Sequence, residues 1–351
     1  MSAGDGGNLA ASELEPSAAV TDPREFARPE NIHKVLTNLR AKDPVHWVEV
    51  EKNADVFRNG DRSTVLVARD MLDAIGAKFN SPHLTHSVVN MDGSDHRAYR
   101  MLTQAWFMPG NLKKLSDRIR VIARDHVDRM MDRGGMCDFV EDIALNYPLR
   151  VVMEILGVPE NDEGMMLALT QQLFGARDPE KSRDAGAMSD PSTALNVFNA
   201  VLGDFYAYFD QLTEMRRTDP RDDVATVIAN AKIDGKPIAK REANSYYVLV
   251  ATAGHDTTSA STAGALWGLA EAPDQLARLK ADLSLIPGLV EEAIRWTTPV
   301  KHFMRTAVQD YELRGKKIRA GDWLMLSYMS ANRDEELFDA PFEFQIDRKP
   351  N

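Results

Sequence analysis

The sequence predicts a mostly α-helical fold with small β-sheets at either end of the chain. Apolar residues recur at helical spacing from about residue 95 to residue 296, and Gly or Pro residues punctuate these runs. Strand-like alternation is confined to the N-terminal part and to the segment after Pro299. No internal repeat or linker interrupts the chain. We therefore expect one domain over residues 25–351, preceded by a disordered leader at residues 1–24 that is rich in Gly, Ala, Ser and acidic residues.

The predicted helices end where the sequence supplies helix-breaking residues. Pro109-Gly110, Gly134-Gly135 and Gly157-Val158-Pro159 close successive helices, and Pro273 closes the central one. In chain order the predicted helices span residues 31–42, 68–75, 95–107, 112–132, 145–156, 195–217, 246–270, 276–283 and 289–296.

The predicted strands flank this helical part of the chain. Residues 45–50 alternate between apolar and polar, and residues 64–67 are expected to pair with them across a turn at 59–61. The C-terminal strands are predicted at residues 308–313, 317–318 and 323–326. Segments without apolar periodicity span residues 79–90, 174–191 and 332–351.

Composition restricts the function before any motif is considered. Of 351 residues, 44% are hydrophobic and 27% are charged, as in soluble globular proteins with a sizeable core. The net charge of −11 argues against nucleic acid as a main partner. Cys137 is the only cysteine, so no internal disulfide can form and a cytoplasmic location is expected. Because no basic residue lies near it in sequence, Cys137 is interpreted as a packing or loop residue.

Residues 251–259, Ala-Thr-Ala-Gly-His-Asp-Thr-Thr-Ser, place polar groups in the middle of the apolar run 246–270. A glycine inside a helix costs about 1 kcal/mol relative to alanine, and a buried polar group without a partner costs more. A threonine hydroxyl can bond to the carbonyl one turn earlier and bend the helix, and Gly254 leaves room for a flat group to approach. Asp256 beside Thr257 supplies a carboxylate and a hydroxyl that can pass protons. A functional helix is favoured over a bent packing helix whose polar groups are satisfied.

Other uses of this run are disfavoured by its residues. A membrane span over 248–270 would carry His255 and Asp256 at its centre without flanking basic or aromatic residues. A helical zinc site needs a second histidine one turn from His255, where the sequence has Ser259. The sequence also lacks the GxGxxG, GxxxxGK[ST], GxSxG and HExxH motifs.

Two pairs of charged residues are weaker signals. Glu292 and Arg295 are three residues apart on a predicted helix and can form an ion pair, although an exposed pair of this kind is common. His96 and Arg100 are four residues apart and suit an anionic group, although a solvated basic face is the default interpretation.

Taken together, in this order and spacing, the motifs resemble those of a bacterial cytochrome P450, over the chain from about residue 31 to its end. Residues 253–258 resemble the oxygen-binding motif of the long I helix. Glu292 and Arg295 resemble the ExxR pair of the K helix. His96 and Arg100 resemble the C-helix pair that holds the haem propionates, and Arg305 is similar to the third propionate ligand.

Three further segments support the resemblance. Residues 331–334 and 341–344 resemble the meander that precedes the haem loop. The terpineol-hydroxylase type of bacterial P450 is the most similar, on residues 146–149, 251–259 and 303–307. Glu343 stands where many relatives have an arginine that joins the Glu292–Arg295 pair.

The resemblance implies the cytochrome P450 fold and haem-thiolate monooxygenation, with haem b (iron protoporphyrin IX) and O2. Asp256 is expected to relay protons and Thr257 to hydrogen-bond the oxygen that is being activated. Ala253, Gly254 and Thr257 are expected to line the haem. His96, Arg100 and Arg305 are expected to bind its propionates, and Glu292 with Arg295 to brace the core.

The resemblance also implies the substrate and the partners. Leu249, Thr252, Ala253 and Val300, together with the loop at 79–90, are expected to contact a hydrophobic substrate: a monoterpene alcohol, an aromatic hydrocarbon or a steroid. Residues 174–192 are expected to form a mobile lid. Electrons are expected from NAD(P)H through a reductase and a ferredoxin, which basic residues on one helix would help to dock: Lys113, Lys114, Arg118, Arg120 and Arg124. We expect the protein to be a monomer and not to associate with a membrane.

The cysteine that ligates haem iron in this family is expected beyond Asn351, so none of the residues present is expected to bind the metal. Two hypotheses follow. The chain is a monooxygenase whose recorded sequence stops early, or it is a genuinely truncated, haem-free and inactive fragment that binds at most an apolar ligand.

Overall fold

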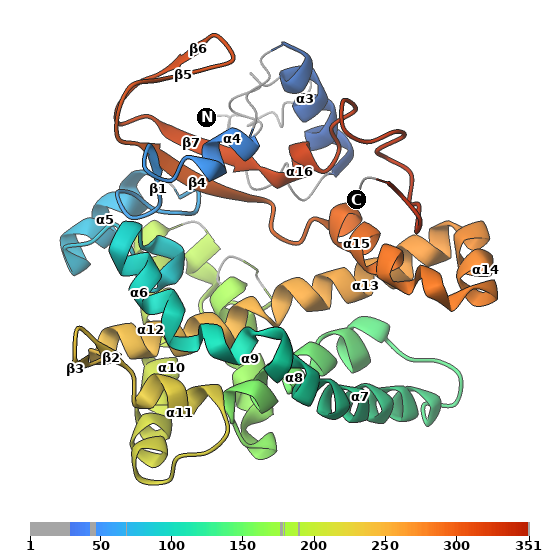
Figure 1. Ribbon diagram of the computed structural model, residues 1–351, viewed down its shortest axis with the longest axis horizontal. Helices are drawn as coiled ribbons and strands as arrows, with labels where there is room; N and C mark the ends of the chain where they lie inside the picture. Colours follow the sequence, from blue (N-terminus) through green and yellow to red (C-terminus); the bar gives the residue numbers. More distant parts are fainter. Residues whose placement is uncertain are drawn as a thin grey trace, which may run out of the picture. The chain divides into compact units, whose positions relative to one another are not determined.

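The computed structural model describes residues 29–42, 47–67, 69–175, 178, 180–188 and 190–349. Helices predominate and the β-sheets are small and antiparallel, which confirms the predicted fold class (Figure 1). The chain divides into two compact units, a terminal unit formed by residues 1–58 and 272–351 and a central unit formed by residues 59–271. The leader predicted at residues 1–24 lies outside the described residues.

The central unit is built from helices and one short hairpin. Its elements are α5 (Arg69–Phe79), η1 (Val88–Asn90), α6 (Gly93–Gln104), η2 (Ala105–Phe107), α7 (Pro109–Met131), the π-helix η3 (Val140–Ala144), α8 (Asn146–Leu156), η4 (Glu160–Asp162), α9 (Glu163–Phe174), η5 (Ala185–Met188), α10 (Pro191–Thr218), α11 (Val224–Ala229), β2 (Lys232–Ile233), β3 (Lys236–Pro237), α12 (Lys240–Ala253) and α13 (Asp256–Glu271).

Aromatic packing holds α12 against α10 in the core of the central unit. The rings of Phe209 and Tyr247 stack with centroids 4.9 Å apart, and Phe205 stacks on Phe209 at 6.0 Å. All three side chains are fully buried. The Tyr247 hydroxyl donates to the carbonyl of Ala225 on α11, so its polar end is satisfied as well. This packing fixes the first half of the helix that carries the candidate site.

The terminal unit contains a three-stranded sheet, a hairpin and several helices. Its elements are α3 (Pro29–Lys42), α4 (Trp47–Lys52), β1 (Phe57–Arg58), α14 (Pro273–Ala281), η6 (Leu283–Leu285), α15 (Ile286–Thr297), β4 (His302–Ala307), β5 (Tyr311–Leu313), β6 (Lys316–Ile318), β7 (Trp323–Ser327) and α16 (Tyr328–Ala331). The sheet has the order β1-β4-β7 and is antiparallel throughout, with Phe57 opposite Ala307 and Met304 opposite Met325. Residues 332–349 form the irregular meander that was predicted.

The N-terminal strand pair predicted from alternation is wrong. Residues 47–52 form helix α4, and residues 64–67 form no strand. The strand in this region is β1, which pairs with β4, so its partner comes from far along the chain. Phe57 and Val50 are buried in one core cluster with Ala307 and Leu326, and this long-range packing overrides the local pattern.

No helix in the described part of the chain is both long and apolar enough to span a membrane.

Candidate functional site

The predicted distortion of the central helix lies at Gly254 and His255. The run forms two helices, α12 and α13, that are separated by these two residues (Figure 1). The backbone N–H groups of Gly254 and His255 both donate to the carbonyl of Thr252, and not to the carbonyls four residues earlier. The α-helical hydrogen-bond ladder is therefore interrupted where the polar residues are concentrated.

Threonine side chains bond to the backbone on both sides of this break. The Thr257 hydroxyl donates to the carbonyl of Ala253 at 2.9 Å, and the Thr252 hydroxyl donates to that of Val248 at 2.7 Å. Bonds of this kind to the preceding turn bend helices, as the sequence predicted for this motif.

The break has one buried face and one more accessible face. Ala251, His255 and Ser259 follow each other at intervals of four residues and are all buried. At the same interval on another face, Ala253 is exposed and Thr257 is half-buried. Small side chains thus leave the backbone accessible on the face that carries the Thr257 hydroxyl.

The role predicted for the missing Cβ of Gly254 needs correction. A Cβ at this position would stand 2.8 Å from Cγ2 of Val152 on α8. The room left by the glycine is therefore filled by the neighbouring helix and is not open to a flat group. Close packing of α8 against the break accounts for the glycine.

Burial changes the titration of both residues that follow Gly254. Burial lowers the pKa of His255, whose ring is fully buried, and so favours the neutral imidazole. Burial also raises the pKa of Asp256, whose side chain is 37% exposed, and the nearby His255 opposes this shift. Asp256 therefore holds a proton to higher pH than an ordinary aspartate, as a proton donor requires.

The two cations predicted on α6 lack carboxylate partners. His96 is half-buried and Arg100 is exposed, and the side chain of neither forms a hydrogen bond or ion pair with a described residue. Arg305 lies on β4 in the terminal unit, 3.7 Å from Glu51, and donates to the carbonyl of Met304. The unpaired basic side chains of α6 and an accessible small-residue face in the same unit fit a planar, apolar group with anionic substituents.

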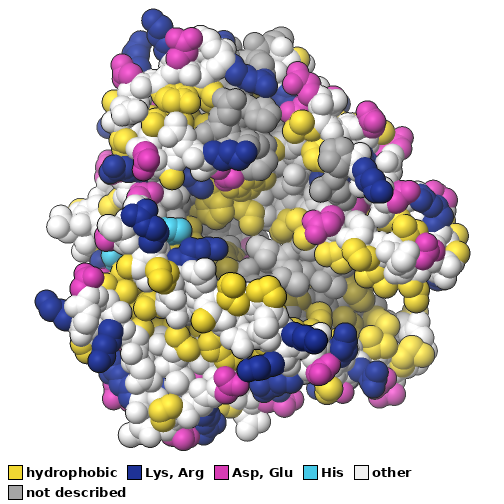
Figure 2. Space-filling model, viewed as in Figure 1, with side chains coloured by type: hydrophobic (Ala, Val, Ile, Leu, Met, Phe, Trp, Pro, Cys, Tyr) yellow, Lys and Arg dark blue, Asp and Glu magenta, His cyan; other side chains and the backbone are white. Residues whose placement is uncertain are grey.

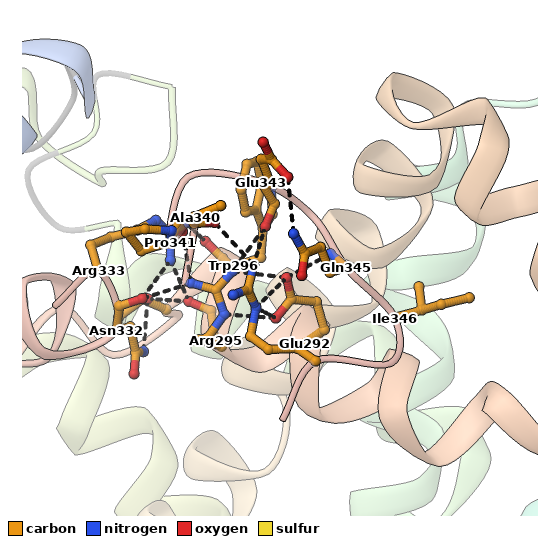
Figure 3. Close-up of polar contacts among 12 residues, drawn as sticks. Glu292, Arg295, Trp296, Asn332, Arg333, Ala340, Pro341, Glu343, Gln345 and Ile346 are labelled. Carbon is orange, nitrogen blue, oxygen red and sulfur yellow. Dashed lines mark hydrogen bonds and ion pairs between the residues drawn. The ribbon is translucent and has the colours of Figure 1, made fainter. Parts of the chain in front are cut away.

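Glu292 and Arg295 on α15 form the predicted ion pair, and it is buried (Figure 3). Arg295 donates Nε to one carboxylate oxygen at 2.6 Å and Nη2 to the other at 2.8 Å, while both side chains are at most 4% exposed. Arg295 also donates to the carbonyls of Asn332, Pro341 and Glu343 in the meander. The pair therefore fastens the meander to α15.

Sequence reasoning missed the third member of this cluster, Arg348. Its Nε lies 3.1 Å from Oε2 of Glu292, and its guanidinium donates to the Glu343 carbonyl. The second arginine that joins the Glu292–Arg295 pair is thus Arg348 and not the residue at position 343, because the Glu343 side chain is exposed. The backbone of Ile346 lies against Gly288 so closely that any Cβ there would collide with it.

The residues predicted to contact substrate are divided between the two units. Leu249 is half-buried on α12, and Thr252 is buried with its hydroxyl already bonded to the backbone. Val300 is half-buried in the terminal unit, between α15 and β4. The loop at 79–90 is fastened to α12 by two bonds of His86: Nδ1 lies 3.1 Å from Glu242, and the backbone N–H donates to Ser245.

The basic residues of α7 are exposed but partly paired. Arg120 forms an ion pair with Asp117 at 2.9 Å, and Arg118 pairs with Glu154. Figure 2 shows Lys and Arg side chains interspersed with Asp and Glu over the face that it displays. The lid segment predicted at 174–192 is only partly described; within it η5 forms a turn of 3-10 helix.

Comparison with known proteins gives a consistent result. A family model described as Cytochrome P450 matches residues 25–348. Cytochrome P450-terp of Pseudomonas sp is 45% identical over 350 residues, which cover 94% of this chain and 81% of that protein. The steroid C26-monooxygenase of Mycolicibacterium smegmatis is 30% identical over 338 residues, covering 90% of this chain and 75% of that protein.

Solved structures show the same fold. CYP108D1 from Novosphingobium aromaticivorans has a TM-score of 0.84 at 44% identity, covering 96% of this chain and 83% of that one. Mycobacterium marinum CYP268A2, solved in complex with pseudoionone, has a TM-score of 0.81 at 28% identity, covering 96% and 82%.

Proposed function

The chain belongs to the cytochrome P450 family of monooxygenases, and on that premise we propose that it inserts one oxygen atom of O2 into a C–H bond of a hydrophobic small molecule, a terpenoid alcohol in the first place. The observation that carries the proposed site is the helix break at Gly254–His255. Asp256, whose pKa burial raises, and Thr257 directly follow this break, and Thr257 shares an accessible face with the small residue Ala253.

Residues of the central unit fit a haem: His96 and Arg100 would hold its propionates, and Ala253 and Thr257 would face the macrocycle. Arg305 is proposed as a further propionate ligand on the resemblance to the family alone. When bound, the haem supplies O2 activation and the oxidation of the C–H bond, while the protein supplies binding, orientation and protons.

Proton delivery follows from the state of two side chains. The raised pKa of Asp256 favours its protonated form, which would donate a proton at the break and take a new one from solvent through its exposed part. The Thr257 hydroxyl gives its own hydrogen to the Ala253 carbonyl. Its oxygen lone pairs therefore remain available to accept a hydrogen bond from a group bound at the accessible face.

The contacts proposed for the substrate are apolar. The side chains of Leu249 and Ala253 are entirely carbon, and the hydroxyl of the buried Thr252 is already bonded to the Val248 carbonyl. These apolar side chains suit contact with a hydrocarbon skeleton. The similarity to Cytochrome P450-terp favours a terpenoid, and the similarity to a steroid C26-monooxygenase makes a steroid the next candidate, before an aromatic hydrocarbon.

A ferredoxin is the electron donor that we propose, itself reduced from NAD(P)H by a reductase. The exposed basic side chains of α7, including Lys113 and Lys114, support this docking by charge complementarity. Arg118 and Arg120 contribute less, because carboxylates already pair with them.

An isotope experiment tests the proposed function. The haem-loaded protein, ferredoxin, reductase and NAD(P)H are supplied with ¹⁸O2 and with a terpenoid alcohol, a steroid or an aromatic hydrocarbon in separate reactions. We expect the terpenoid product to gain one ¹⁸O atom and to form fastest. Products that take their new oxygen only from water, or the absence of any oxygenated product from all three classes, would overturn the proposal.

A further inference from the structure

His255 is a fully buried polar side chain at the helix break to which no role has been given. Its ring nitrogen Nε2 lies 2.9 Å from the carbonyl oxygen of Leu145. A carbonyl can only accept, so Nε2 must carry the hydrogen and donate it. Leu145 directly follows the π-helix η3, and its own N–H donates to Val140, five residues earlier. The ring is therefore held by a neighbouring element of the same unit.

The other ring nitrogen, Nδ1, has no hydrogen-bond partner among the described residues, although it is buried. A buried acceptor without a partner costs about 1–3 kcal/mol, so such an atom calls for a role. Among the described residues, the acid that pairs with it is Asp256, whose Oδ1 lies 3.8 Å away. Because burial keeps the imidazole neutral and Nε2 holds the hydrogen, Nδ1 presents a bare lone pair toward that carboxyl group.

Resting on the proposed function, we propose that His255 is a positioning residue for Asp256: anchored on the Leu145 carbonyl, its ring accepts the hydrogen of the protonated Asp256 carboxyl and holds this proton at the helix break. A rotation of the Asp256 side chain closes the gap between the two groups. A protonated carboxyl is a donor, so it would satisfy the buried Nδ1 atom. When Asp256 gives up its proton it becomes a carboxylate, and it takes a new proton from water.

Electrostatics agree with this arrangement. The influences on His255 are its burial, the Leu145 carbonyl and Asp256, and those on Asp256 are its burial and His255. A histidine that served packing alone would not need its unpartnered Nδ1 close to the Asp256 carboxyl group.

Two substitutions test the roles of the two ring nitrogens of His255 separately. The amide of His255→Gln reaches the Nε2 position, so it can still donate to Leu145 but offers nothing at Nδ1. The amide of His255→Asn reaches the Nδ1 position, so it can face Asp256 but loses Leu145. Each variant keeps one half of the proposed arrangement and removes the other.

Infrared spectroscopy gives a readout that does not depend on turnover. The C=O band of the protonated Asp256 carboxyl is assigned by its loss in Asp256→Asn. We expect this band to shift to higher frequency in His255→Gln, because the hydrogen-bond acceptor is gone, and to stay near its wild-type position in His255→Asn. A band that does not move in His255→Gln, or that moves equally in both variants, would overturn the proposal.

Turnover and a wild-type measurement complete the test. In the haem-loaded enzyme we expect His255→Gln to lower kcat about tenfold with KM unchanged, less than the 10²–10⁴-fold typical of losing the proton donor itself. If neither variant folds, ¹⁵N-histidine NMR of the wild type decides: Nδ1 must lack a hydrogen of its own, and its signal must move in Asp256→Asn. A doubly protonated ring would contradict the proposal, whereas the expected infrared shift with unchanged turnover would count against the proposed function alone.

Discussion

The buried cluster of Glu292, Arg295 and Arg348 is held together by the negative charge of Glu292. Removing this charge is the perturbation with the largest expected effect on stability. In Glu292→Gln, the carboxylate that accepts from Arg295 and Arg348 becomes a neutral amide. The two guanidinium groups are 4% and 3% exposed and would be left without a counter-charge. Breaking a buried ion pair in this way costs about 3–5 kcal/mol, a large part of the 5–15 kcal/mol typical of a folded domain.

The comparison variant is Glu343→Gln, which makes the same chemical change five residues before Arg348. The Glu343 side chain is exposed and accepts from the Gln345 side-chain amide, while its backbone carbonyl accepts from Arg295 and Arg348. We therefore expect its free energy of unfolding to stay within about 0.5 kcal/mol of wild type. Both variants are unfolded in urea and followed by circular dichroism. If Glu292→Gln is no less stable than Glu343→Gln, the buried charge cluster does not stabilise the terminal unit.

A double variant tests the electrostatic reason directly. Arg348→Met alone removes one guanidinium from Glu292 but leaves Arg295 paired with it. Combined with Glu292→Gln, it also removes one of the two uncompensated positive charges. We expect the double variant to lose less stability than the sum of the single losses, because the residues share one network. Strict additivity would mean that the cost arises from packing and not from charge.

Two further predictions concern the central unit. Gly254→Ala should lower the free energy of unfolding by about 1–3 kcal/mol, because the new Cβ meets the Val152 side chain. The control is Gly203→Ala on α10, where a Cβ has no neighbour within 4 Å. This control should be neutral or stabilising by up to about 1 kcal/mol. Thermal unfolding measures both, and equal effects at the two glycines would contradict the packing argument. Glu242→Gln breaks the contact with His86 and should speed hydrogen exchange of residues 80–90 up to about fivefold, since such part-exposed pairs contribute at most about 1 kcal/mol. The exposed Glu271→Gln serves as control, and equal exchange in the two variants would show that this ion pair does not hold the loop.

Local patterns predicted the helices because their signals lie within one or two turns. Apolar spacing and the closing Gly and Pro residues located α7 and α8, and the spacing of Glu292 and Arg295 predicted their ion pair. The break in the central helix was also predictable, because Gly254 and Thr257 act on the backbone of their own segment.

Long-range contacts were beyond the reach of such patterns. Strand β1 is two residues long and is defined by its pairing with β4, so no alternation could locate it. Arg348 lies in an irregular meander, where no periodicity relates it to Glu292. His255 binds a carbonyl 110 positions away, which a π-helix places against the break. In each case tertiary packing decides the role of the residue.

Thr257 is the residue proposed to control oxygen activation at the helix break, and the coupling of electrons to product measures this role most directly. In the haem-loaded enzyme, Thr257→Ala should divert electrons from oxygenated product to hydrogen peroxide, with NAD(P)H still consumed. Thr258→Ala removes the neighbouring exposed hydroxyl and should leave the ratio of product to NAD(P)H unchanged. An unchanged ratio in Thr257→Ala, or an equal loss in both variants, would contradict the account.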